Sequence, residues 1–472
     1  MTKDKNQTSM LRFERSWRNL DPVRVGVARA SNGKLRWLNL VVATTLIAKF
    51  ACAVRAYTLA FASTPTAERS VSLKNLATLC MAVLTAVFMS SAYAQKLYDT
   101  GASDSEIKIG NIMPYSGGLS SLSTLGKVEA AYFKALNERG GINGRKINFI
   151  SYDDGYSPPK TVEQARKLVE SDEVLAVFSV LGTPTNSAIQ KYLNSKKVPH
   201  LFIASGGTKW GDHAGFPWSI GWQPSFQTEA RIYAKHLSEI RPSAKVAVFY
   251  QNDDFGKDLA KGFKEGPPVG GPTIVTEESY DVSEPTMDSH VAKMKASGAD
   301  TLMIFASAKY AALTIKKTAE LGWTPLKFVP YVSAFVESVM RPAGFDAAEG
   351  SISAAYIKDP SDPQWKDDEG MKKFMDFYTK QFANSGKMDE QLAAVGYSMA
   401  QTLEHLIRQC GDDLTRANVM KQAANLRDVS LDLLLPGVKL NTSPVDFYPI
   451  KQLRLMRFES GSWKLYGAAM SD

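Results

Sequence analysis

The stretch "ASGGTKWGD" places residues that could hold a small anion at the end of a predicted buried strand. It follows the apolar run "VPHLFI" and brings together Gly206, Gly207, Thr208 and Trp210. Glycine lets the backbone approach a ligand closely, and the Thr208 hydroxyl can donate one hydrogen bond. The indole of Trp210 offers a rigid apolar face. A plain turn uses the same residue types, so the stretch alone leaves both interpretations open.

A second stretch of this kind, "LGTPTNS", ends the preceding predicted strand. Gly182 exposes its backbone, Thr183 is predicted to cap a helix, and Pro184 fits the first helical position. Free amides at a helix N-terminus carry positive partial charge, which suits an anion such as a carboxylate. An ordinary capped helix would have the same pattern. Because the two stretches end neighbouring strand candidates, we expect them to converge on one carboxylate.

Aromatic and hydroxyl side chains at other predicted strand ends could complete this site. Phe255 follows one apolar run, and Tyr331 and Ser333 end another. Tyr156 lies on a loop nearer the N-terminus. Each aromatic ring could instead belong to a hydrophobic core. We predict all four as ligand-binding residues.

The sequence lacks the motifs that catalysis, metal binding or nucleotide binding would require. The five histidines include no pair at metal-ligand spacing. No GxxxxGK[ST] or GxGxxG motif follows a predicted strand. Cys410, at the end of a long predicted helix, is expected to be structural. We therefore predict a protein that is not an enzyme and that holds neither a metal nor a cofactor.

Alternating strands and helices would position the strand-end residues. From Ile107 onward, nearly continuous apolar runs alternate with amphipathic segments, a pattern typical of parallel sheets covered on both faces. The alternation begins again after Gly221, which predicts two doubly wound α/β lobes, each with its own sheet. Helices over 367–384 and 390–409 and a hairpin over 451–466 follow. In such sheets ligands bind beyond the carboxyl ends of the strands.

The basic charge lies in the first fifth of the chain. The 472 residues carry a formal charge of +8, but residues 1–94 hold 13 Lys and Arg against 4 Asp and Glu. The remaining residues hold 43 against 44. Nucleic-acid binding is therefore not predicted, because the chain after residue 94 has no basic footprint.

Residues 71–94 have the layout of a cleavable secretory signal. A basic start precedes an uncharged apolar run over 76–89, and a small-x-small cleavage pattern ends at Ala94. The run is too short to span a bilayer. Because export signals are read at an N-terminus, residues 1–70 are predicted to be a wrongly assigned or disordered extension. A membrane tether through the apolar run 38–62 is the alternative.

With its predicted export signal, two lobes and strand-end loops that face a central cleft, the chain resembles the periplasmic solute-binding proteins of ATP-binding-cassette (ABC) importers, in the Leu/Ile/Val-binding branch. The similarity covers about residues 105–467. The segments that carry it are "IKIGNIMPYSG", "LNERGGINGRKINFISYDDGYSP", "LGTPTNSA", "VPHLFIASGGT", "YQNDDFGKD" and "AAEGSI". Their combination in this order is specific, although each segment alone is a weak signal. The stretches "GGTKWGD" and "GWQPSFQTEA" look like those of relatives that import aromatic acids.

The resemblance implies a type I fold, in which three crossing segments join the lobes, here near Gly221, Tyr356 and Gly437. The expected boundaries are 95–221 and 357–437 for lobe I, and 222–356 and 438–472 for lobe II. Family members hold ligand by hinge closure and present the closed form to membrane permease subunits. We therefore expect a periplasmic monomer whose partners are a small carboxylate and an ABC permease.

The resemblance also implies which chemical groups of a ligand this chain could hold. In the family, the ligand carboxylate meets the loops that match 182–183 and 206–208, and an aromatic flanks it at the position of Phe255. Amino-acid binders hold the ammonium with an acidic residue at the strand end that here reads "PYVSA", where no carboxylate occurs before Glu337. A buried, unpaired ammonium is costly. We therefore expect an aromatic or apolar acid without an α-amino group.

Two alternatives remain open. Asp253 or Asp254 could supply the missing anion, and the ligand would then be a branched-chain amino acid, another amino acid or an amide. Related lobes also serve as ectodomains of ligand-sensing receptors, which would require a persistent membrane tether.

We expect the mature protein to begin at Gln95, after cleavage behind Ala94. Mass spectrometry of the protein recovered from the periplasm of a bacterial host would then detect an N-terminal peptide starting at this residue. Peptides from residues 1–94 in the exported protein would contradict cleavage and favour the tether.

Overall fold

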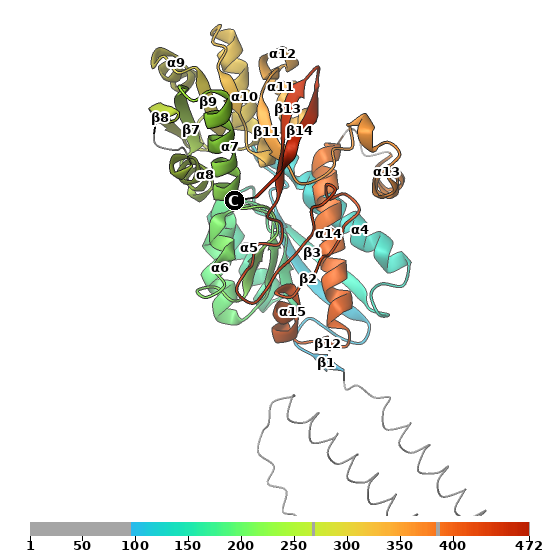
Figure 1. Ribbon diagram of the computed structural model, residues 1–472. Coiled ribbons are helices and arrows are strands. Elements are labelled where there is room, and N and C mark those ends of the chain that lie inside the picture. Colours follow the sequence, from blue (N-terminus) through green and yellow to red (C-terminus); the bar gives the residue numbers. More distant parts are fainter. Residues whose placement is uncertain (1–95, 267–269, 384–387, 472) are drawn as a thin grey trace, which may run out of the picture. The chain divides into compact units, whose positions relative to one another are not determined.

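Two α/β lobes, each built around its own sheet, make up the described part of the chain in the computed structural model (Figure 1). The structure describes residues 96–266, 270–383 and 388–471. The predicted signal and the extension before it lie outside these residues. Within the described ranges, no helix has the length and apolar character needed to cross a membrane. The two lobes confirm the predicted fold class.

The sheet of lobe I has five parallel strands in the order β3-β2-β4-β5-β6. Its strands are β2 Glu106–Met113, β3 Lys146–Asp153, β4 Ala176–Phe178, β5 His200–Ile203 and β6 Ser219–Gly221. Its helices are α4 Thr124–Glu138, α5 Pro158–Glu170, α6 Thr183–Lys196, α14 Glu390–Cys410 and α15 Arg416–Ala423. Apolar side chains of α5 and α6 pack on one face of this sheet, and α4 packs with α14 on the other.

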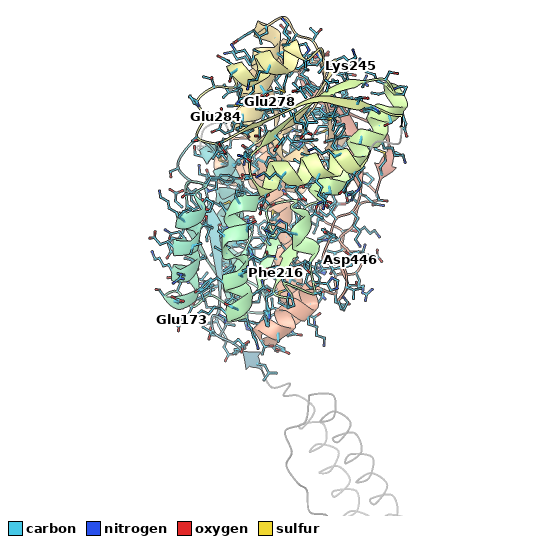
Figure 2. The ribbon with its side chains drawn as sticks, turned by 90° about the vertical axis from the view of Figure 1, so that its left-hand side faces the viewer. Glu173, Phe216, Lys245, Glu278, Glu284 and Asp446 are labelled. Atoms are coloured by element: carbon cyan, nitrogen blue, oxygen red, sulfur yellow. The ribbon has the colours of Figure 1, made fainter. Side chains whose placement is uncertain are left out.

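The sheet of lobe II repeats this order and adds an antiparallel hairpin, giving β8-β7-β9-β10-β11-β13-β14. Its strands are β7 Lys245–Gln251, β8 Thr273–Tyr280, β9 Thr301–Phe305, β10 Leu326–Phe328, β11 Ile352–Ala355, β13 Leu453–Glu459 and β14 Ser462–Met470. Its helices are α7 Phe226–Ile240, α8 Asp254–Glu265, α9 Asp288–Ala296, α10 Ala308–Glu320, α11 Arg341–Ala343 and α12 Phe345–Ala348. In Figure 2, Glu278 and Glu284 mark this lobe and Glu173 marks lobe I.

Three segments carry the chain between the two sheets. They follow β6, follow β11 and precede β13. Helix α13 Glu369–Phe382 lies between the second crossing and α14, and β1 Leu97–Tyr98 pairs with β12 Asp413–Leu414 at the base of lobe I (Figure 1). In each lobe the first strand lies second from one edge of the sheet, and the chain winds outward from it in both directions, which creates a crevice at the carboxyl ends of the strands.

Two predicted elements end or begin at other residues than expected. The predicted strand that Tyr331 and Ser333 were expected to end stops earlier, at Phe328, because Pro330 has no N–H for a ladder, and residues Tyr331–Ser333 form a 3-10 turn. The helix predicted from residue 367 begins at Glu369, because the Asp368 side chain accepts the backbone N–H three residues later at 2.8 Å and caps the helix.

A buried carboxyl group fixes the loop after β10 against α7. Glu229 Oε1 accepts hydrogen bonds of 2.6 Å from the Tyr233 hydroxyl and of 2.6 Å from the Tyr331 backbone N–H. Its Oε2 has no hydrogen-bond partner among the described residues. Burial raises the pKa of Glu229 from 4.5 to about 8, against the opposing effect of these two hydrogen bonds. The group is therefore mostly protonated in the folded protein at neutral pH.

The free energy of unfolding of the wild type should fall as the pH rises to about 8, and we expect Glu229→Gln to remove this fall. Because the pKa is higher in the folded than in the unfolded chain, the group stabilises the fold at low pH and this contribution is lost as the pH rises to about 8. Relative to the wild type, the variant should gain roughly 3–4 kcal/mol in free energy of unfolding between about pH 5 and pH 8.

Urea denaturation at several pH values measures this difference. Glu239→Gln, an exposed position on the same helix, is the matched control and should follow the wild type at every pH. Parallel pH profiles for wild type and Glu229→Gln would contradict the assignment.

Candidate ligand-binding site

A cavity between the lobes, here called the interlobe cavity, is lined by strand-end loops of both sheets. Lobe I contributes the loops after β3, β4 and β5, and lobe II contributes those after β7, β9 and β10. The structure brings five of the predicted site residues to its wall, namely Tyr156, Gly182, Thr183, Phe255 and Ser333. Whether these residues bind a ligand stays a prediction.

The N-terminus of α6 faces this cavity without a capping side chain. The prediction that Thr183 caps this helix is wrong, because α6 begins at Thr183 and Gly182 holds the cap position. Gly182 has a φ of 101°, which other residues rarely adopt, and a Cβ there would lie 2.5 Å from the Tyr156 ring. Among the described residues, no side chain accepts a hydrogen bond at this cap. The backbone N–H groups of Thr183 and Thr185 are therefore available to an anion, whereas Pro184 between them has none.

The direction of three hydrogen bonds leaves the hydroxyl hydrogen of Thr183 free. Ser205 Oγ accepts from the Gly207 N–H at 3.1 Å and from the Trp210 indole N–H at 3.0 Å. A hydroxyl accepts two hydrogen bonds and donates one. Ser205 must therefore donate to Thr183 Oγ1, which is 2.8 Å away. Thr183 accepts this bond and can donate its own hydrogen to a ligand.

The other predicted site residues lie beside the interlobe cavity. Trp210 is buried, donates its indole N–H to Ser205 and is not on the cavity wall, and Tyr331 lines a neighbouring cavity. A Cβ on Gly206 would lie 2.1 Å from the Tyr331 hydroxyl, and a Cβ on Gly207 would lie 2.8 Å from the Trp210 indole nitrogen. These two glycines therefore make room for protein side chains.

Thr208 connects the two lobes at the side of the cavity. Its backbone N–H donates to Asp258 at 2.7 Å, and its hydroxyl lies 2.8 Å from that of Ser225. The adjacent Lys209 forms a 3.1 Å ion pair with Asp254. Both aspartates belong to α8, so the 3-10 helix Thr208–Gly211 of lobe I is held against lobe II at two points.

The N-terminus of α8, in contrast with that of α6, already has a carboxylate. Asp253 Oδ1 accepts the N–H groups of Phe255 at 2.9 Å and Gly256 at 3.4 Å, and Oδ2 accepts the side-chain amide of Gln251. Burial raises the pKa of Asp253, although these bonds oppose the shift. Neither Asp253 nor Asp254 is among the described residues on the cavity wall.

Helix α10 of lobe II also begins at the cavity. Ser307 and Ala308 line the wall, and α10 has no capping side chain among the described residues. The Ser307 hydroxyl instead donates to Gln251 Oε1 at 2.7 Å. The positive ends of two helices, one from each lobe, therefore face the same space.

The rest of the wall is apolar and aromatic. Phe226 and Phe255 meet edge to face with ring centroids 5.1 Å apart. Among the described residues that line the cavity, none is charged. Nor do the described residues form any cluster of His, Cys, Asp or Glu that could hold a metal.

Several lining residues were not predicted as site residues. Ser205 and Ser307 follow strands, so the strand-end rule could have identified them. Leu122 and Leu125, near the start of α4, and Leu392, on α14, carry no local signal of this kind, because only the packing of distant segments brings them to the cavity.

The periplasmic binding protein family matches residues 106–462 of this chain. Leu/Ile/Val-binding protein homolog 7 of Brucella suis is 22% identical over 347 residues, which cover 71% of this chain and 85% of that protein.

Two solved structures share the fold. A branched chain amino acid ABC transporter protein of Thermus thermophilus with bound valine has a TM-score of 0.69 and 16% identity, covering 79% of this chain and 98% of that chain. A fatty acid ABC transporter substrate-binding protein of Thermomonospora curvata has a TM-score of 0.69 and 20% identity, covering 80% and 95%. Because the family match extends over well more than half of its length, this chain belongs to the periplasmic binding protein family.

Proposed function

We propose that this protein is the substrate-binding component of an ABC importer and captures a small carboxylate without an α-amino group. The observation that carries the proposal is the uncapped N-terminus of α6, with its free amides and the donating Thr183 hydroxyl, on the wall of the interlobe cavity. Backbone amides and a hydroxyl are the donors that a carboxylate accepts. The facing N-terminus of α10 adds positive potential from the other lobe.

The absence of a charge on the described wall favours an acid over an amino acid. An α-ammonium group would lose its hydration in this cavity and find no carboxylate there among the described residues, which is unfavourable. Aromatic rings of Tyr156, Phe226 and Phe255 would contact an apolar or ring-bearing body. Ligand held by both lobes would favour the closed form, which the permease would receive.

A branched-chain amino acid is the second candidate ligand. The names of the Brucella relative and the valine bound in the Thermus structure favour it. The name of the Thermomonospora protein instead favours an acid that lacks an ammonium group. The two candidates differ in one chemical group, so a direct comparison of ligands distinguishes them.

We expect the exported protein to bind aromatic monocarboxylates such as benzoate and phenylacetate, and to bind leucine weakly or not at all. The physical reason is that the cavity offers donors to the carboxylate and no partner to an ammonium. Isothermal titration calorimetry and thermal shift measure both ligands. Benzamide, which has the ring of benzoate without its charge, is the control and should bind more weakly. Tight leucine binding with no response to the acids would contradict the acid proposal.

Thr183→Val should weaken binding of the same acid roughly ten- to a hundredfold, because a hydrogen bond to a charged group contributes about 1.5–3 kcal/mol. Thr208→Val is the matched control, since the Thr208 hydroxyl pairs with Ser225 away from the interlobe cavity. Calorimetry on both variants, with melting temperatures to check folding, measures the difference. If Thr183→Val kept the affinity of the wild type, the assignment of the donor to Thr183 would be wrong.

A further inference from the structure

A second cavity, here called the rear cavity, lies next to the interlobe cavity on the side of the crossing segments. Gln223, Val332, Phe335 and Leu392 line both cavities, so these side chains form a partition between the two spaces. The rear cavity continues past them to residues of β11, α14 and β13.

The two spaces have nearly equal volumes, about 70 Å³ for the interlobe cavity and 60 Å³ for the rear cavity. Each is comparable to about five water molecules, which is little room for an acid longer than benzoate. A longer ring-bearing acid anchored at α6 would therefore extend through the partition into the rear cavity.

Gln223 places an unsatisfied polar atom in this partition. The residue is 8% exposed, and its Oε1 has no hydrogen-bond partner among the described residues. A buried acceptor without a donor costs about 1–3 kcal/mol. Because Gln223 lines both cavities, an O–H or N–H group midway along a ligand would supply the missing donor.

The charged groups on the rear wall are already paired. The Lys358 ammonium lies 2.8 Å from both carboxylate oxygens of Asp368. Asp359 accepts the side-chain amide of Gln391 at 2.7 Å, and Gln391 accepts the Val336 backbone N–H at 2.6 Å. These groups therefore need no charged partner from a ligand.

Apolar groups make up the remainder of the rear wall. The rings of Tyr331 and Tyr356 meet edge to face with centroids 5.3 Å apart, next to Val395 and Met456. Such a wall suits the apolar end of a ligand.

We propose that the two cavities together hold one elongated carboxylic acid. Its carboxylate lies at α6, a hydroxyl or amide N–H group in its middle donates to Gln223, and its apolar end enters the rear cavity when the side chains of the partition move aside. The inference rests on the proposed function, because the carboxylate at α6 sets the direction of the ligand. It assigns a specificity role to Gln223 and to the rear wall.

Three acids test the proposal by calorimetry on the exported protein. Benzoate is the short probe, hippurate is a long probe with an N–H in its middle, and 3-benzoylpropanoate is the same length with a methylene in place of that N–H. We expect hippurate to bind about tenfold more tightly than 3-benzoylpropanoate, and we expect Gln223→Leu to abolish this difference.

Ala355→Leu is designed to fill the rear cavity, because Ala355 lines that cavity and is absent from the described wall of the interlobe cavity. It should weaken hippurate binding about tenfold or more and leave benzoate affinity unchanged. Retained benzoate binding also demonstrates that the variant folds. Val395→Phe, from α14 on the same wall, provides a second variant with the same expected result.

The outcomes separate the two proposals. If benzoate binds and Thr183→Val weakens it, but hippurate gains nothing from its N–H and Ala355→Leu has no effect, the elongated-ligand inference is wrong and the proposed function stands. If none of the three acids binds, both are overturned.

Discussion

The candidate site depends on the hydrogen bond that Ser205 donates to Thr183. Ser205 already accepts two N–H groups, from Gly207 and from the buried Trp210, so the direction of its own bond is fixed. Thr183 is thereby left as a donor at the start of a helix whose cap is the bare backbone of Gly182. This local arrangement makes the Thr183 hydroxyl a donor and leaves the positive end of the α6 dipole uncapped. It also lets the Tyr156 ring lie close to Gly182.

Three of the helices that begin at or beside the cavity, α6, α8 and α10, differ in how their N-termini are capped. Helix α8 carries its own anion in Asp253, whereas α6 and α10 begin without a side-chain cap. The uncapped helices belong to different lobes, so one bound anion would interact with both dipoles when the lobes are together. Ligand charge and lobe closure are then physically coupled, because separating the lobes removes one of the two helix ends from the anion.

The sequence predicted what depends on local pattern. Apolar runs and helical periodicity identified most strands and helices. The rule that ligands bind at the carboxyl ends of strands predicted Tyr156, Thr183 and Phe255, and all three lie on the cavity wall. The rule could not tell which atoms of a strand-end loop face the cavity. Gly206 makes room for the distant Tyr331, and Thr208 contacts α8 and Ser225. Those partners are chosen by tertiary packing, which residue types in one loop do not encode.

The contact of residues Thr208–Gly211 with α8 combines two interactions of different physical character. The ion pair between Lys209 and Asp254 is about half exposed, with side chains 40% and 51% accessible, so dissolved salt screens it. The short hydrogen bond from the Thr208 N–H to Asp258 depends on contact geometry and is screened far less. The contact between the two lobes at this point therefore contains a component set by ionic strength, independent of any ligand.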